Sequence, residues 1–250
     1  MAEPWLWPAG LGLLGLIFGS FIATLAIRWP EGRPVSRGRS ACDGCGTVLK
    51  AHELVPVVSY VAQGGRCRHC GSAIAPSHLA VELFGLAVGV AAGLAEPGIG
   101  GVAGAVFGWL LLTLATLDLA AFWLPNLATG ALAATGLAAA AIGLEPSIQD
   151  RLIGGAAGFL VLWLVAEGYR RTRGRIGMGG GDPKLFGGIG LWLGWHALPA
   201  VLLIACVCGL AAVLVLRVAG RRLAADDALP FGVLLAAAAF PAWILRALLA

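Results

Sequence analysis

Charged residues are scarce in this sequence, at 12% of its 250 residues, while hydrophobic residues make up 59%. Soluble domains carry roughly 25% charged residues, so an ordinary soluble domain is excluded and lipid is the expected solvent for most of the chain. Histidine is also rare, with four residues. No motif supports a serine and histidine pairing among Ser20, Ser59 and His196, which argues against a serine intramembrane protease.

Other absences narrow the function further. The sequence has no predicted strand that is followed by a glycine-rich loop of the kind that binds nucleotides. Residues 1–4 contain no basic residue, and no small-x-small cleavage site follows the first apolar segment, so we expect that segment to remain as an anchor. Inverted repeats and paired broken helices, which favour a transporter, are not detected either.

What the sequence has instead is a series of long apolar segments. A membrane-spanning helix needs about 20 mainly apolar residues, and we find about eight candidates. They are residues 7–27, 79–94, 99–117, 124–144, 152–167, 185–198, 200–216 and 229–248. The division between the sixth and seventh segments depends on His196 and Pro199. We therefore expect an all-α polytopic membrane protein, with Gly85, Gly89 and Gly93 at a spacing typical of close helix packing in lipid.

Basic residues are distributed unevenly between the loops. Of the 17 lysines and arginines, all but Arg151 and Arg246 follow the first, fifth or seventh crossing. The basic residues that follow these crossings are Arg28, Arg33, Arg37, Arg39, Lys50, Arg66, Arg68, Arg170, Arg171, Arg173, Arg175, Lys184, Arg217, Arg221 and Arg222. Because positively charged loops stay in the cytoplasm, this bias predicts a cytoplasmic face for odd-numbered loops and an N-terminus outside. The net charge of +4 thus reflects topology and gives no reason to expect nucleic acid binding.

The polar stretch 28–77 contains two C-x-x-C pairs. Cys42 and Cys45 form the first pair, and Cys67 and Cys70 form the second. This spacing is typical of a structural zinc site with four thiolate ligands, and the metal would supply folding free energy that so small a core lacks. Glycines at 44, 46 and 71 suit tight knuckle turns. Two disulfides are the alternative, which a reducing cytoplasmic loop disfavours.

Two aspartates interrupt apolar surroundings. Asp118 ends the third segment, and Asp182 follows the glycines of Gly179-Gly180-Gly181. Carboxylates at such positions are costly, so they indicate function by default. Asp118 follows three crossings and Asp182 follows five, which places both on the cytoplasmic face, where they could meet and divide general acid and base roles.

Plainer interpretations exist for each aspartate taken alone. Asp182 before Pro183 could serve as a helix N-cap, and Asp118 could be an interfacial charge at a helix end. A cation transporter could also use paired carboxylates, and a scaffold could use the cysteine module to dock partners. We expect Gly179 and Gly181 to shape the site, because glycine allows close backbone approach and positive φ; Lys184 is included as a neighbouring site residue.

These motifs together resemble the type IV prepilin peptidases, bacterial membrane aspartyl proteases with a G-x-G-D motif. The resemblance covers nearly the whole chain in order. Its elements are Gly19-Ser20-Phe21, Arg28-Trp29-Pro30, the cysteine module with Glu53-Leu54-Val55-Pro56, Val81-Glu82-Leu83, Asp118 with Pro125, Gly179 to Leu185, Gly190 to Trp195 and Leu229 to Gly232. Ala23-Thr24 and Trp29 depart from the family pattern, which bears on substrate handling or methylation more than on proteolysis.

The resemblance implies a function and a division of the chain. It implies that Asp118 and Asp182 cleave the basic leader of prepilins and pseudopilins after a glycine, at the cytoplasmic face of the bacterial inner membrane. It also implies N-methylation of the new N-terminus with S-adenosylmethionine, an activity that nothing else in the sequence indicates. We expect a first helix at 1–28, a zinc module at 29–78 and a peptidase domain at 79–250.

Overall fold

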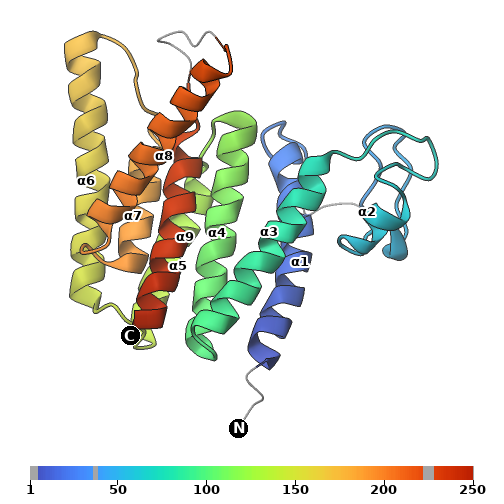
Figure 1. Ribbon diagram of the computed structural model, residues 1–250, viewed down its shortest axis with the longest axis horizontal. Helices are drawn as coiled ribbons and strands as arrows, with labels where there is room; N and C mark the ends of the chain where they lie inside the picture. Colours follow the sequence, from blue (N-terminus) through green and yellow to red (C-terminus); the bar gives the residue numbers. More distant parts are fainter. Residues whose placement is uncertain (1–4, 36–38, 222–227, 250) are drawn as a thin grey trace. The chain divides into compact units, whose positions relative to one another are not determined.

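The computed structural model describes residues 5–35, 39–221 and 228–249. Residues 1–4, Arg37 and Arg222, which contributed to the topology prediction, lie outside this part of the chain. The described residues form helices joined by turns, without a β-sheet (Figure 1). The helices are α1 (Leu6–Arg28), η1 (Ala51–Glu53), α2 (Val58–Ala62), α3 (Pro76–Ala95), α4 (Ile99–Ala121), α5 (Asn126–Ala141), α6 (Ile148–Arg173), α7 (Asp182–Leu193), α8 (Leu198–Val218) and α9 (Phe231–Leu249).

Six of the described helices are long and apolar enough to cross a membrane, namely α1, α3, α4, α6, α8 and α9. The remaining two predicted segments also form helices but are shorter: α5 has 16 residues and α7 has 12. The predicted segment 185–198 had its boundaries wrong, because the helix starts at Asp182 and stops where Gly194 adopts a φ of 74°. The predicted break near His196 and Pro199 is confirmed, since α8 starts at Leu198 with proline in its first turn.

The chain divides into two compact units, residues 1–112 and 113–250, with the boundary inside α4. In the first unit, α1 and α3 lie side by side (Figure 1). Their glycines meet directly: a Cβ added to Gly85 would lie 2.2 Å from the Gly15 carbonyl oxygen, and one added to Gly89 would lie 2.1 Å from that of Leu11. The predicted packing role of this glycine row is therefore confirmed.

In the second unit, α7 packs against α5, α6 and α9 and buries nearly all of its side chains. Close approach to α6 again depends on glycine, because a Cβ on Gly190 would lie 2.2 Å from the carbonyl oxygen of Gly154. Trp192 donates its indole N–H to the Leu132 carbonyl at 2.8 Å and ties α7 to α5. This surrounding of α7 holds its N-terminal residue, Asp182, in a fixed place.

Arg151, one of the two basic residues that break the charge bias, is 1% exposed. Its guanidinium donates hydrogen bonds to the backbone carbonyls of Gly136, Leu144, Glu145, Pro146, Leu191 and Trp192, at 2.8–3.3 Å. The last carbonyls of a helix have no partner within it, so this one side chain satisfies the end of α7 together with carbonyls of the turn between α5 and α6. The sequence interpretation treated Arg151 only as a topological exception and missed this role.

Candidate functional site

Asp118 lies three residues before the end of α4 and is 5% exposed. Its Oδ2 accepts a hydrogen bond from the backbone N–H of Val233, at 3.1 Å, in the first turn of α9. Gly232 is so close that a Cβ added to it would lie 2.9 Å from the same oxygen. Asp118 is thus a carboxylate held against the start of another helix, rather than a charge left at a helix end.

Asp182 is the first residue of α7 and is 7% exposed. The N-cap position belongs to Gly181, and Pro183 lies in the first turn as predicted. Asp182 is therefore not the N-cap residue of α7, contrary to the plainer interpretation. Asp182 is close enough to Asp118 to interact with it electrostatically.

Leu124 connects the segments around the two aspartates. A Cβ added to Gly181 would lie 2.6 Å from the Cβ of Leu124, and one added to Gly232 would lie 3.2 Å from its Cδ1. The leucine side chain therefore packs between the loop before Asp182 and the start of α9. The structure brings Asp118, Asp182 and these glycines together in the second unit.

The expectation that the glycines before Asp182 adopt positive φ is wrong. Gly181 has a φ of −81°, and neither Gly179 nor Gly180 is among the positive-φ residues. Space is the physical reason for glycine at 181, because a side chain would collide with Leu124. At Gly179 an added Cβ would lie 3.5 Å from Asp182 Oδ2, and at Gly180 it would meet nothing within 4 Å.

Lys184 lies in the first turn of α7 and donates a hydrogen bond from Nζ to Oδ1 of Asn126, at 2.7 Å. Asn126 is the first residue of α5, so the bond joins the starts of α5 and α7. Beside it, a cavity of about 330 Å³ opens between α6 and the glycine loop, lined by Trp163, Gly180 and Lys184 among others. This cavity gives the site a partly apolar wall next to Asp182.

The four predicted cysteine ligands gather in the first unit. The sulfur atoms of Cys42, Cys45, Cys67 and Cys70 all lie within 4.8 Å of one another, and all four are free thiols. The cluster forms on the loop between α1 and α3. Four thiolates in this arrangement could hold a metal ion; the disulfide alternative is not what the structure contains.

The two cysteine pairs repeat one turn structure. In the first, the amide of Gly46 donates to the Cys42 carbonyl at 2.8 Å; in the second, the amide of Gly71 donates to the Cys67 carbonyl at 2.9 Å. Gly46 and Gly71 have φ values of 71° and 72°, so the predicted need for glycine is confirmed there. The backbone N–H two residues after Cys42 and after Cys67 points to each sulfur at 3.4 Å. Such turns bring the four sulfur atoms together from two separate segments.

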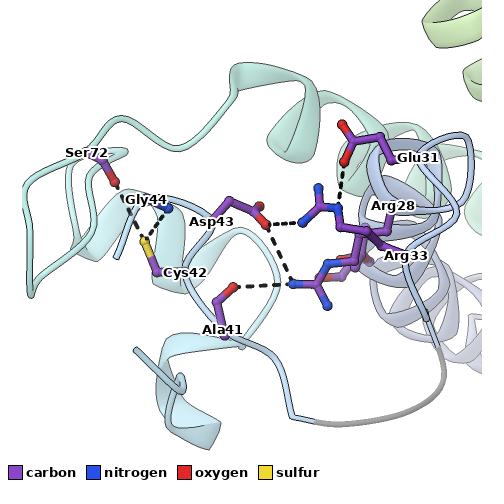
Figure 2. A network of polar contacts seen from close by, with 10 residues as sticks. Arg28, Glu31, Arg33, Ala41, Cys42, Asp43, Gly44 and Ser72 are labelled. Carbon is purple, nitrogen blue, oxygen red and sulfur yellow. Dashed lines mark hydrogen bonds and ion pairs between the residues drawn. The ribbon is translucent and has the colours of Figure 1, made fainter. Parts of the chain in front are cut away.

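Arginines attach the module to the end of α1. Asp43 accepts a hydrogen bond from Arg33 at 3.0 Å and lies 3.9 Å from Arg28. Arg28 also donates to the Ala41 carbonyl at 3.4 Å. Figure 2 shows both arginines pointing to this part of the module. Cys42 Sγ lies 3.7 Å from the Ser72 hydroxyl in the same view. Arg28 and Arg33, which the sequence analysis related only to membrane topology, therefore also order the module.

Comparison with known proteins agrees with this picture. Residues 13–95 match the model of the bacterial peptidase A24 N-terminal domain, and residues 105–214 match that of the type IV leader peptidase family. A prepilin leader peptidase/N-methyltransferase of Burkholderia pseudomallei is 38% identical over 262 residues, covering 92% of this chain and 84% of that protein. Proteins of the same name from Aeromonas hydrophila and Dickeya chrysanthemi are 36% and 32% identical, covering 82% and 92% of this chain and 80% and 89% of their own length. No solved structure matches the chain.

Proposed function

The chain belongs to the type IV leader peptidase family, and from this premise we propose that it is a membrane aspartyl endopeptidase with Asp118 and Asp182 as its catalytic pair. The observation that carries the proposal is that two buried carboxylates, from α4 and α7, lie on either side of the packing around Leu124, beside a glycine loop that leaves room for backbone. We further propose that its substrates are prepilins and pseudopilins.

The chemistry follows from the neighbouring carboxylates. Two such groups cannot both ionise easily, so they share one proton and titrate as a pair. The ionised carboxylate takes a proton from a water molecule, whose oxygen attacks the peptide carbonyl carbon. The neutral carboxyl group meanwhile donates a hydrogen bond to the peptide carbonyl oxygen. The resulting tetrahedral intermediate collapses when the leaving amine receives a proton, and the peptide C–N bond breaks.

The surroundings of Asp182 suit a peptide substrate. At Gly180 no atom lies within 4 Å of an added Cβ, so a substrate backbone can approach the loop closely. Pro183 and Lys184 line the cavity of about 330 Å³ between α6 and the glycine loop. We propose that Gly179 and Gly181 shape the site by leaving space, and that Lys184 shapes it by holding Asn126. A substrate bond placed here lies beside the carboxylates rather than in open lipid.

We assign the four-cysteine cluster to structural Zn²⁺. Four thiolates leave no open position for a water molecule, and a metal held by them stabilises a small loop rather than performing chemistry. The proposed functional division is a first helix at 1–28, a zinc module at 29–78 and a peptidase domain at 79–250. We propose that the module and both aspartates face the cytoplasm at the bacterial inner membrane, with the N-terminus outside, because basic residues follow the odd-numbered crossings.

The relatives' names include N-methyltransferase, so we propose that the new N-terminus is then methylated with S-adenosylmethionine. In that step the lone pair of the neutral amine attacks the methyl carbon, the carbon–sulfur bond breaks towards sulfur, and the methylated amine releases a proton. A chain that performs only proteolysis is the alternative, and methyl incorporation separates the two.

The decisive experiment is cleavage of a model prepilin by the purified full chain in detergent. Asp118→Asn and Asp182→Asn should each lower kcat by about a thousandfold or more, because one ionisable partner cannot fill both proton roles. Glu96→Gln is the matched control, since this carboxylate stands at the C-cap of α3. Substantial turnover by either asparagine variant would rule out the two-aspartate mechanism.

A further inference from the structure

In each cysteine pair of the module, the sulfur atom of the first cysteine faces a backbone amide. The backbone nitrogen of Gly44 donates to Cys42 Sγ at 3.4 Å, and that of His69 donates to Cys67 Sγ at 3.4 Å. Both donors belong to the main chain of the two turns, so they do not depend on the side chains at positions 44 and 69.

The sulfur atom of the second cysteine faces a side-chain hydroxyl. Thr47 Oγ1 lies 3.3 Å from Cys45 Sγ, and Ser72 Oγ lies 3.1 Å from Cys70 Sγ. Each hydroxyl residue stands two positions after its cysteine and directly after a glycine, so the pattern C-x-x-C-G-[ST] occurs twice in the chain. The cysteines and glycines of this pattern predicted the metal site, whereas its two hydroxyls played no part in that prediction.

The backbone holds both hydroxyl residues in place. The amide of Cys42 donates to the Thr47 carbonyl at 3.0 Å, and the amide of Cys67 donates to the Ser72 carbonyl at 2.9 Å. Each turn therefore closes on its own hydroxyl residue, and the hydroxyl reaches the sulfur atom without any displacement of the chain.

Ser72 also reaches the other cysteine pair. Its Oγ lies 3.7 Å from Cys42 Sγ, as Figure 2 shows. Gly44 leaves room for this hydroxyl, because a Cβ added to Gly44 would lie 2.7 Å from Ser72 Oγ and 3.6 Å from Cys70 Sγ. One hydroxyl thus faces a sulfur atom of each pair, at the place where the two turns meet.

Metal binding decides the direction of these hydrogen bonds. Cysteine binds a metal as the thiolate, which has no proton to donate, so the hydroxyls of Thr47 and Ser72 become the donors. Four thiolates carry more negative charge than one divalent ion neutralises, and donors around the ligands spread the remainder and orient the sulfur atoms. The module supplies such a donor to each of its four sulfur atoms.

We infer that Thr47 and Ser72 are positioning residues of the metal site, and that Ser72 sets how firmly the metal is held because its hydroxyl joins the two cysteine pairs. This role rests on the proposed zinc assignment and adds to it two residues outside the ligand set. It also gives a reason for glycine at position 44, which is space for the Ser72 hydroxyl.

Zinc release from the purified full chain in detergent tests the inference without any measurement of enzyme activity. A chromophoric chelator in excess reports the release rate. Ser72→Ala should release zinc about tenfold to a hundredfold faster than the unmodified chain, the size of effect expected when a group that supports metal ligands is lost. Thr47→Val removes a hydroxyl that faces one sulfur atom and should have a smaller effect.

Two further variants act as controls for the release measurement. Ser72→Thr keeps the hydroxyl and should release zinc more slowly than Ser72→Ala does. Ser77→Ala, in the first turn of α3, should release zinc at the rate of the unmodified chain. A folded Ser72→Ala protein that releases zinc at the unmodified rate overturns the inference.

The Co²⁺-substituted chain separates a hydrogen bond to sulfur from a looser loop. Loss of an O–H donor raises the electron density on sulfur, so the thiolate-to-Co²⁺ charge-transfer band of Ser72→Ala should move to longer wavelength. Ser77→Ala should leave that band in place. Faster zinc release with an unmoved band would show that Ser72 acts only through the fold of the loop, and would overturn its role as a donor.

Failure of the zinc assignment can be told apart from failure of this inference. An unmodified chain purified without zinc would refute the assignment, and the inference with it. Zinc that is bound by the unmodified chain, with a release rate insensitive to Ser72, would refute the inference alone. Leader cleavage is measured separately in both cases.

Discussion

Asp118 Oδ2 and the backbone amide of Val233 lie 3.1 Å apart although 115 positions separate them in the chain. The bond connects the end of α4 to the start of α9. It gives the carboxylate one fixed donor and leaves its orientation dependent on how closely α9 approaches. The approach is close because residue 232 is glycine.

Gly232→Ala should therefore impair catalysis. The added methyl would lie 2.9 Å from Asp118 Oδ2, so the carboxylate must turn or α9 must retreat. Small displacements of catalytic groups can cost about a hundredfold in rate, and we expect kcat for a model prepilin to fall by at least about tenfold. Gly130→Ala, where nothing lies within 4 Å, should retain full activity. Equal activity of the two variants would show that the α9 contact does not position Asp118.

Gly181→Ala tests the space before Asp182. Its methyl would lie 2.6 Å from the Cβ of Leu124, so the loop must move away and carry Asp182 with it. We expect a kcat loss of about tenfold to a hundredfold. The double variant Gly181→Ala with Leu124→Ala should recover part of the activity, since it removes the collision. Failure of the second substitution to restore any activity would contradict the steric explanation.

Arg151→Ala should destabilise the second unit more than any exposed arginine does. Its removal leaves six backbone carbonyls without their buried donor, and each unsatisfied group costs about 1–3 kcal/mol. Thermal unfolding in detergent should show a marked fall in Tm or a failure to fold. Arg173→Ala, exposed in the last turn of the same helix, is the control and should leave Tm nearly unchanged. Similar Tm values for both variants would show that Arg151 does not stabilise the second unit in this way.

The zinc assignment predicts one tightly held zinc ion per chain by elemental analysis of protein purified without added metal. Cys42→Ser with Cys45→Ser removes two of the four clustered sulfur ligands and should abolish that zinc. The change loosens the loop between α1 and α3, whereas the two aspartates lie on α4 and α7. Methyl incorporation should therefore fall more than leader cleavage does. Leader cleavage lost as completely as in Asp182→Asn, in a variant that still folds, would instead make the module part of the peptidase site.

Sequence periodicity and spacing determined much of this protein. The apolar segments, the glycine row of α3 and the four-cysteine module are local patterns, because membrane crossing, close helix packing and knuckle turns each depend on a few consecutive residues. Asp118 and Asp182 were identifiable for the same reason, since a carboxylate in an apolar segment is conspicuous whatever it touches.

Only the tertiary structure decided which groups surround these residues. No local pattern relates Asp118 to Val233, Leu124 to Gly181, or Arg151 to the Leu191 carbonyl at the end of α7. The need for glycine at 181 likewise comes from a neighbouring leucine, so a rule based on φ alone mispredicted its conformation. Such contacts depend on helix packing between distant segments, and packing follows from the shapes of both partners at once.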